Sequence, residues 1–331
     1  MEELNTFEHK SQHPGCMHGC GHDGHTVMLL AAARYLAQTK NFDGTVQFIF
    51  QPAEEANEHG SGAQAMIDDG LFERFPVDNV FAMHNAPGFM AGAIATCSGP
   101  ITASMDLFEV TIQAKGCHGA TPYDGVDPIM IATQMLSAWQ TIISRNVDAE
   151  DSAVLSACSI NAGDSWNVIP DNAVIKGSVR ALSQGVRQLI EKRFYTLTEN
   201  IAEAFDAKVE INYRRCFPCT INNIEQTNFA CDVADAIFGS DRVLRTLPPG
   251  MGSEDFAFML QERPGCYLIV GAENMPEEQN LLKGRNINAM SLEPFTFKSA
   301  CMLHQPNYDF NDEIIPIGAT LFARLAERYL V

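Results

Sequence analysis

Five residues with metal-binding side chains lie at separate points of the sequence, most of them beside an expected strand or helix. The stretch MHGCGHDGHT holds Cys20 and His22 with one glycine between them, so a thiolate and an imidazole can face one ion from a loop. Glu55 follows the run VQFIF, His84 ends the run VFAM, and His304 lies in LHQPNYDFND. Together these donors suffice for two ions that share a ligand. Each one alone also fits a plainer interpretation: a polar loop, an acidic turn or a structural histidine.

Glu54 stands directly before Glu55, after a run of strand-forming residues. Catalytic groups in parallel α/β sheets gather at the carboxyl ends of strands, which is where this pair is expected. Two adjacent carboxylates can divide the work: one coordinates a metal while its neighbour takes a proton from water. A solvated acidic turn is the alternative.

The elements around these residues predict an α/β layer. Residues 26–38 have helical spacing with Asp23 as a candidate N-cap, and the β-rich runs 45–52 and 79–85 flank a helical stretch at 61–72. Strand, helix, strand in that order is typical of a parallel sheet. The chain returns to similar material after residue 215, with helices near 226–238 and 253–261, a strand at 266–272, and a final helix from Pro316.

Between these parts the pattern changes to strand, helix, strand, strand, helix, strand. The expected ranges are 106–114, 127–145, 153–160, 173–181, 184–205 and 208–213. This βαββαβ order is the ferredoxin-like pattern and is complete in itself, so it predicts an inserted domain. We therefore expect a discontinuous metal-binding domain of residues 1–100 and 215–331, with residues 101–214 inserted.

Composition narrows the class of partner. The 331 residues include 22 basic and 41 acidic side chains, and the net charge of -19 repels phosphate backbones and anionic membranes. We expect neither a nucleic-acid nor a membrane partner. No run reaches about 18 apolar residues, and the first residues lack a signal-peptide pattern, so the cytoplasm is the expected location. The ten scattered cysteines are expected to be reduced.

Eight stretches occur in one order along nearly the whole chain: MHGCGHDGHT, FQPAEE, AMHN, GCHGATP, NVIPD, GSVRA, GSEDFA and HQPNYDFND. In this the chain resembles the metal-dependent amidohydrolases that include hippurate hydrolase, N-acyl-amino-acid deacylases and plant auxin-conjugate hydrolases. These are relatives of aminoacylase and carboxypeptidase G. The resemblance implies a metallopeptidase-like α/β domain with an inserted lid, and hydrolysis of the amide bond of an N-acyl or N-aroyl amino acid.

The resemblance also implies roles for individual residues. Two divalent metal ions, zinc or manganese foremost and cobalt or nickel as alternatives, would be held by Cys20 as the bridge, His22, Glu55, His84 and His304. Glu54 would be the general base and then the acid. The lid would form a homodimer and carry His118 to the partner subunit's site, while Asn167 and Arg180 would bind the substrate carboxylate. Asp23 and His25 would support the ligands rather than bind metal.

Three features depart from the family pattern. A long segment that usually precedes the first motif is missing, so we expect an N-terminally truncated form. Tyr123 stands where the lid motif usually has a histidine, and residues 275–302 form an unusually long connection. An alternative is therefore an inactive or unstable homologue that binds metal or a carboxylate without turnover. A zinc nucleobase deaminase does not fit, because the His-x-Glu and Pro-Cys-x-x-Cys pairing is absent.

Overall fold

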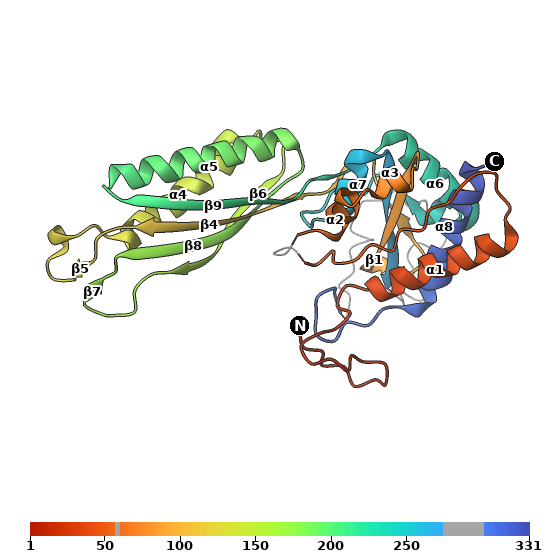
Figure 1. Ribbon diagram of the computed structural model, residues 1–331, viewed down its shortest axis with the longest axis horizontal. Coiled ribbons are helices and arrows are strands. Elements are labelled where there is room, and N and C mark those ends of the chain that lie inside the picture. Colours follow the sequence, from red (N-terminus) through yellow and green to blue (C-terminus); the bar gives the residue numbers. More distant parts are fainter. Residues whose placement is uncertain (57–59, 274–300) are drawn as a thin grey trace.

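The chain folds into two lobes that lie end to end (Figure 1). The computed structural model describes residues 1–56, 60–273 and 301–331. We call the part with both chain ends the terminal lobe, and the part from Ser104 to Phe217 the inserted lobe. The long connection expected at 275–302 lies almost wholly outside the described residues.

The terminal lobe is built on a mixed four-stranded sheet of order β1-β12-β2-β11. The strands are β1 (Val80–Met90), β12 (Gly265–Glu273), β2 (Ile94–Ala95) and β11 (Val243–Leu244). β1 runs parallel to β12 and β11 parallel to β2, but β12 and β2 are antiparallel. The expectation of a purely parallel sheet was wrong, because the chain turns back directly from β1 into β2.

The strand predicted at 45–52 does not form in the part of the chain that the structure describes. A cavity of about 800 Å³ lies between residues 44–51 and the first residues of β1, Val80–His84. Strands pair at about 4.8 Å, so a gap of this size prevents a hydrogen-bonded ladder between them. The β-rich run therefore crosses the lobe without a strand neighbour.

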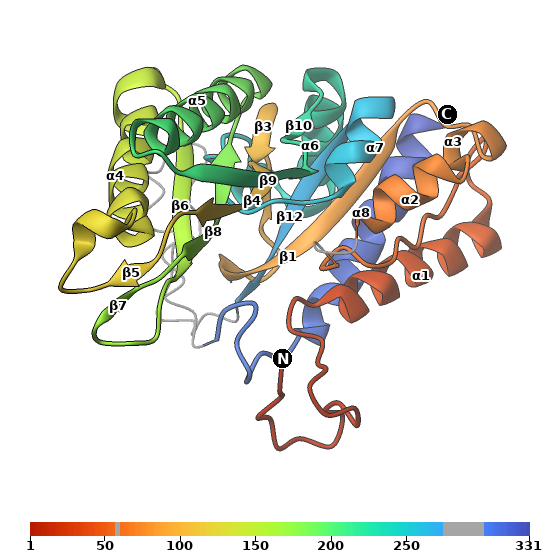
Figure 2. The ribbon, with the colours of Figure 1, turned by 60° about the vertical axis from the view of Figure 1, so that its left-hand side comes forward.

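Helices surround this sheet (Figure 2). They are α1 (His22–Thr39), α2 (Gly62–Asp68), α3 (Leu71–Arg74), α6 (Ile224–Phe238), α7 (Phe256–Glu262) and α8 (Ile315–Tyr329). Apolar side chains from α1, α6 and α8 pack with those of β1 and β12 in one core that includes Met28, Val233, Leu268 and Leu321. None of the described helices is long and apolar enough to cross a membrane.

Helix α1 begins earlier than predicted. Its N-cap is Gly21, with φ of 83°, and Asp23 lies in the first turn without capping it, so the prediction of Asp23 as N-cap was wrong. A Cβ at position 21 would lie 2.6 Å from Asn85 Oδ1 and 2.7 Å from Tyr308 Oη. Glycine is required here both by the left-handed conformation and by the close approach of these side chains.

The inserted lobe contains all six elements predicted for it. They are β4 (Ser104–Gln113), α4 (Pro128–Asn146), β6 (Ala153–Asn161), β8 (Asn172–Ala181), α5 (Gln184–Ala204) and β9 (Lys208–Phe217). The strands form an antiparallel sheet of order β6-β8-β4-β9. A short pair, β5 (Cys117–His118) with β7 (Val168–Ile169), lies at the end away from the terminal lobe (Figure 1). At the other end, β3 (Gly99–Thr102) pairs with β10 (Thr220–Asn222).

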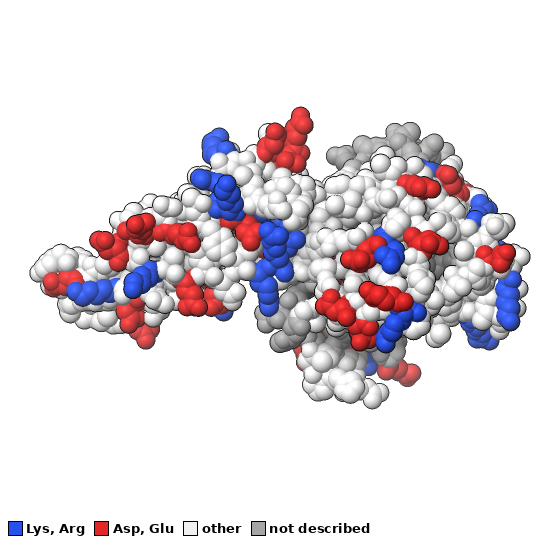
Figure 3. Space-filling model, turned by 45° about the horizontal axis from the view of Figure 1, so that its top comes forward, with Lys and Arg blue, Asp and Glu red and all other residues white. Residues whose placement is uncertain are grey.

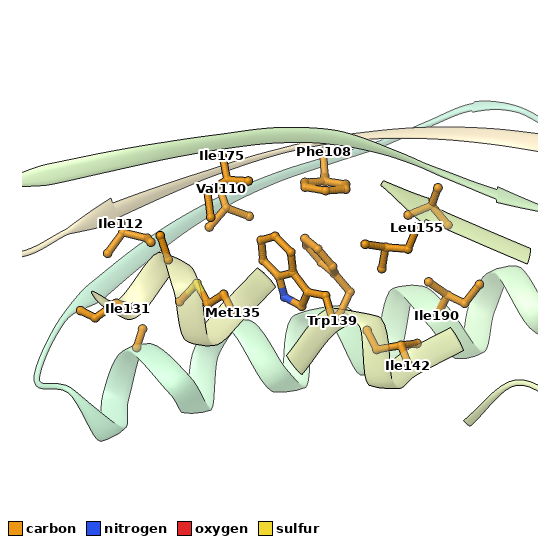
Figure 4. Close-up of a cluster of buried hydrophobic side chains, with 14 of the residues drawn as sticks. Phe108, Val110, Ile112, Ile131, Met135, Trp139, Ile142, Leu155, Ile175 and Ile190 are labelled. Atoms are coloured by element: carbon orange, nitrogen blue, oxygen red, sulfur yellow. The ribbon is translucent and has the colours of Figure 1, made fainter. Parts of the chain in front are cut away.

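The core of the inserted lobe lies between its sheet and the helices α4 and α5 (Figure 4). Trp139 is fully buried, and its ring centroid lies 5.4 Å from that of Phe108 and 4.7 Å from that of Phe194. Its indole N–H donates to Thr198 Oγ1 at 2.9 Å, so the polar edge of the ring is satisfied inside the core. This aromatic cluster fixes both helices against one face of the sheet.

A buried ion pair crosses from this sheet to α5. Arg187 donates to both carboxylate oxygens of Asp106, and Tyr213 Oη donates to Asp106 Oδ2 at 2.8 Å. Asp106 is completely buried and Arg187 is 5% exposed. Burial and the neighbouring carboxylate raise the pKa of Tyr213, which keeps its hydroxyl protonated as a donor.

On the face of the molecule in Figure 3, acidic and basic side chains are interspersed over both lobes. Lys176 and Glu109 form one such exposed pair on neighbouring strands of the inserted lobe. Exposed pairs of this kind contribute little to stability because solvent screens them.

The buried pair gives a prediction for stability. Replacing Arg187 with Met should lower the free energy of unfolding by about 3–5 kcal/mol, because it leaves the Asp106 carboxylate buried without its partner. Both tryptophans, Trp139 and Trp166, lie in the inserted lobe, so fluorescence during urea unfolding reports this lobe. The control Lys176→Met breaks the exposed pair and should cost no more than about 1 kcal/mol. Equal losses in the two variants would contradict this assignment.

Candidate metal centre

The five residues with predicted metal-binding side chains and Glu54 meet in the terminal lobe. Donor atoms within 4.8 Å of one another form four overlapping groups in the described chain. The groups are Cys20, His22, His84; Cys20, Glu55, His304; His22, Glu54, Glu55; and Glu54, Glu254, Asp255. Cys20 is shared by the first two groups, which together hold all five predicted ligands. A cavity of about 310 Å³ opens beside Cys20, His22, Glu55 and His304.

His84 is oriented by its own strand. It lies in β1, and its Nδ1 donates to the backbone oxygen of Asn85 at 2.7 Å. This fixes the tautomer in which Nε2 carries a free lone pair, and Nε2 lies 3.4 Å from Cys20 Sγ. Desolvation lowers the pKa of His84 to about 4, so the imidazole is neutral at pH 7 and suited to bind a metal.

His304 comes from the loop before α8 and has a strained backbone. Its φ is 61°, a left-handed value that is rare for histidine, and its backbone N–H donates to Gly19 O at 2.7 Å. Leu4 N also donates to Pro306 O at 2.8 Å, so the first and last loops of the chain are tied together. His304 Nε2 is thereby held 2.8 Å from Glu55 Oε1.

Glu54 and Glu55 lie on a turn that follows the extended run 45–51. Ala53 has φ of 56°, a second strained residue beside the site. Desolvation and, after it, the charges of Glu254 and Glu55 raise the pKa of Glu54 to about 9. Desolvation likewise raises the pKa of Glu254 to about 7. Without a cation, these carboxyl groups cannot all ionise together.

The pKa values of Cys20 and His22, next to these carboxyl groups, are shifted toward the uncharged forms as well. Burial, assisted by the charges of Glu55 and Glu54, raises the pKa of the Cys20 thiol, while desolvation lowers the pKa of His22. A protonated thiol, neutral imidazoles and crowded carboxyl groups are the states expected of a donor set without its ions. Thiolate, imidazole and carboxylate donors at these spacings fit zinc-like divalent metals.

Two residues of this cluster, Glu254 and Asp255, were not expected from the sequence to have a role. Glu254 accepts from Tyr267 Oη at 2.9 Å, and both carboxyl groups are more than nine-tenths buried. They belong to the stretch GSEDFA, which contributed to the family resemblance but carries no metal-ligand spacing of its own. Two acidic residues directly before an apolar run were the available signal.

His25, which was expected to support the ligands rather than bind metal, contacts the strand that carries His84. His25 does not appear among the metal-binding groups; its Nε2 accepts from the backbone N–H of Asn85 at 3.0 Å, next to His84. Asn85 Nδ2 in turn donates to Tyr308 Oη at 2.7 Å. These contacts join α1, β1 and the loop before α8 directly behind the ligands.

Arg180 lies at the junction of the two lobes. It stands near the end of β8, and its Nη1 donates to Ser253 Oγ at 3.0 Å, beside Glu254. Desolvation lowers the pKa of its guanidinium. Arginine side chains nevertheless stay charged in proteins. A planar cation thus faces the terminal lobe from the inserted one.

His118 and Asn167 lie together at the opposite end of the inserted lobe. Gly119 N donates to Asn167 O at 2.8 Å, and both side chains are exposed. The part of β8 from Asn172 to Arg180 separates them from Arg180, roughly 26 Å at about 3.3 Å per residue. The structure therefore does not bring them to the metal-binding residues of their own chain (Figure 1). Tyr123, close by, is 81% exposed.

Known proteins resemble this chain over most of its length. Hippurate hydrolase of Campylobacter jejuni is 38% identical over 330 residues, which cover 100% of this chain and 79% of that protein. N-acetyl-L-cysteine deacetylase of Bacillus subtilis is 39% identical over 82% of this chain and 64% of its own length. A solved structure from Bacillus subtilis, described as a dinuclear metal binding peptidase from the M20 family, aligns with a TM-score of 0.77 at 29% identity. It covers 99% of this chain and 78% of that one.

Residues 1–286 match the profile of Peptidase family M20/M25/M40, and this range includes four of the five predicted metal ligands. The fifth, His304, lies in the region shared with hippurate hydrolase, since that match extends over the whole chain. The family match and the relatives at more than 30% identity agree with the convergence of donor groups in the terminal lobe. The chain belongs to Peptidase family M20/M25/M40.

Proposed function

We propose that this protein is a binuclear metal-dependent amidohydrolase that removes an acyl or aroyl group from the nitrogen of an amino acid. The observation that carries the proposal is the meeting of Glu54 with five metal-binding side chains from distant parts of the chain. The relatives named hippurate hydrolase and N-acetyl-L-cysteine deacetylase support this substrate class. The neighbour described as dinuclear supports two ions.

The two overlapping groups suggest how the ions are shared. Cys20, His22 and His84 would hold one ion, and Cys20, Glu55 and His304 the other. Zinc or manganese fits this donor set best, with cobalt or nickel as alternatives. When bound, the two ions would polarise the amide carbonyl and make a water molecule more acidic.

Glu54 is the residue that moves protons. Its carboxyl group lies beside Glu55 and His22 and is partly enclosed, so it can reach a water molecule held at the ligands. Nearby cations favour its ionised form, because opposite charge lowers a carboxyl pKa. Ionised Glu54 takes a proton from the attacking water and then donates it to the nitrogen of the leaving amino acid.

Arg180 is placed to bind the substrate carboxylate. Its guanidinium reaches the terminal lobe from β8, and its hydrogen bond to the described residues of that lobe goes to a neutral hydroxyl, that of Ser253. A substrate carboxylate can replace this hydroxyl with a stronger, charge-assisted pair of hydrogen bonds. The free carboxylate of an N-acyl amino acid meets that requirement.

His118 and Asn167 are proposed to act on the partner subunit. They lie at the far end of the inserted lobe, so a second copy is needed to bring them near a metal centre. We propose that the inserted lobe is a ferredoxin-like lid and dimerisation domain. Strand β6 is at the edge of its sheet and exposes Val154 and Ile160, which supports pairing there. His118 would then stabilise the oxyanion in the partner's site.

Metal binding can be tested directly. After chelation, Mn²⁺ or Zn²⁺ should bind at about two ions per chain, and metal at about 100 times its dissociation constant should stabilise the fold by about 2.7 kcal/mol for each independent site. Cys20→Ala should weaken both sites, while Cys158→Ala, which changes an exposed cysteine of the inserted lobe, should weaken neither. Metal content and thermal unfolding measure this. Unchanged binding by Cys20→Ala would contradict the shared ligand.

The raised pKa of the Cys20 thiol adds a pH dependence. At neutral pH the metal-free thiol is protonated, so metal binding must release that proton and is opposed by acid. Affinity should therefore rise with pH, by about tenfold per unit for each proton released. Metal titrations at several values between about pH 6 and about pH 8 give the slope of affinity against pH. This slope should be shallower for Cys20→Ala than for Cys158→Ala.

Glu54→Gln tests the proton transfer. It should reduce the turnover of hippurate and N-acetyl amino acids by about 10²–10⁴-fold, because an amide cannot take the water's proton. Metal content should stay unchanged. Glu55→Gln is the matched control and should lose metal instead. The opposite pattern would mean that the roles of the two glutamates are exchanged.

Mixed dimers test the role of His118. Glu54→Gln and His118→Ala should each be nearly inactive alone. After unfolding and refolding together, half of the dimers are mixed and one of their two sites is intact, so activity should return to about a quarter of the wild-type value. A mixture that stays inactive would show that His118 serves its own chain, whereas a fully active His118→Ala variant would show that it has no role.

A further inference from the structure

Asp255 is a buried carboxylate that accepts hydrogen bonds from three groups in one short stretch of the described chain. Its Oδ1 accepts from Gln51 Nε2 at 2.5 Å. Its Oδ2 accepts from Ser61 Oγ at 2.7 Å and from the backbone N–H of Ala63 at 3.1 Å. The residue is completely buried. A buried carboxylate with three donors is satisfied, and the removal of its charge leaves donors without a partner.

These three donors lie on either side of the turn that carries Glu54 and Glu55. Gln51 precedes the turn, while Ser61 and Ala63 follow it at the start of α2. The two sides also touch directly, because a Cβ on Gly62 would lie 1.6 Å from the backbone oxygen of Pro52. The ends of this stretch are therefore closed together, with Asp255 bonded to both of them.

Asp255 itself is held by the interior of the terminal lobe. It stands at the N-cap position of α7, and its backbone oxygen accepts from Phe258 N at 2.9 Å. The next residue, Phe256, is buried in a core with Tyr267 of β12. The anchor is thus joined to the sheet, whereas the turn it holds bears an exposed Glu55 and a half-buried Glu54.

We propose that Asp255 is a positioning residue that closes the ends of the turn and so sets Glu54 and Glu55 at their working places. Its effect on catalysis rests on the function proposed above, whereas its effect on the turn does not. We call the bonds of Asp255 the clamp: one arm is the bond to Gln51, and the other is the pair of bonds to Ser61 and Ala63. Glu55 would hold its ion and Glu54 its water at one geometry only while both arms are intact. Partners that orient metal ligands in this way typically change affinity or activity by about 10–100-fold.

The clamp is tested first in the metal-free protein by hydrogen exchange. Asp255→Asn keeps the size of the side chain but has one acceptor oxygen, so its amide group must face a donor on one of the two arms. Exchange should become faster at residues 51–56 and 60–63, including the Ala63 amide, and stay unchanged in the inserted lobe. Gln51→Leu breaks one arm alone and should have a smaller effect on the same residues. Unchanged exchange in both variants would overturn the clamp.

The second measurement asks whether the clamp sets the catalytic groups. With metal restored, Asp255→Asn should lower kcat and metal affinity by about 10–100-fold. KM should stay unchanged, since Arg180 is not part of the clamp. The double variant Gln51→Leu, Asp255→Asn should lose less than the sum of the single losses, because both act on one network. Normal kcat and normal metal affinity in Asp255→Asn would reduce Asp255 to a structural residue and overturn the proposal.

Asn223→Ala provides the matched control for stability. Asn223 caps α6 in the same lobe by accepting from Glu225 N, and its replacement by alanine leaves this N–H without its side-chain acceptor. It should lower the melting temperature without changing kcat, metal affinity or exchange at residues 51–63. If the wild type binds no metal and turns over no amide, the proposed function fails. The exchange experiment still decides whether Asp255 closes the turn.

Discussion

The crowding of acidic groups inside the terminal lobe is the constraint on which the rest of the structure depends. Glu54, Glu254 and the Cys20 thiol all have raised pKa values, chiefly because burial disfavours their charged forms. Such a cluster opposes folding when it is ionised without cations. Divalent ions would reverse the sign of this contribution. The same arrangement that destabilises the metal-free protein would thus favour the binding of metal ions.

Holding such a cluster together requires backbone that is unusual elsewhere in proteins. His304 and Ala53 have positive φ values, and Gly21 adopts a left-handed conformation between Cys20 and His22, two of the predicted ligands. Neighbours hold two of these residues: the backbone of Gly19 holds His304, and packing against Asn85 and Tyr308 holds Gly21. Strain of this kind persists where surrounding contacts over-determine it, which is common at functional sites.

The sequence predicted local elements well and the terminal sheet poorly. The four long strands and two long helices of the inserted lobe were expected, because their periodicity is local and the helices have clear starts, such as Asp127 before α4. The run 45–52 has strand composition, but a strand also requires a neighbour at hydrogen-bonding distance, and here a cavity lies beside it. Asp23 looked like a cap only because the requirement for Gly21 comes from residues more than 60 positions away.

By itself the sequence determined the set of candidate donors, because residue type and local spacing decide which side chains can bind a metal. It also determined the family of the chain, through motifs that occur in one order. It also determined the inserted unit. Only the tertiary structure decided that Glu254 and Asp255 belong to the centre, that Arg180 faces it, and that His118 and Asn167 lie far from it. The reason is that carboxylate pairing and strand neighbours depend on which distant segments meet, and a single sequence does not contain that information locally.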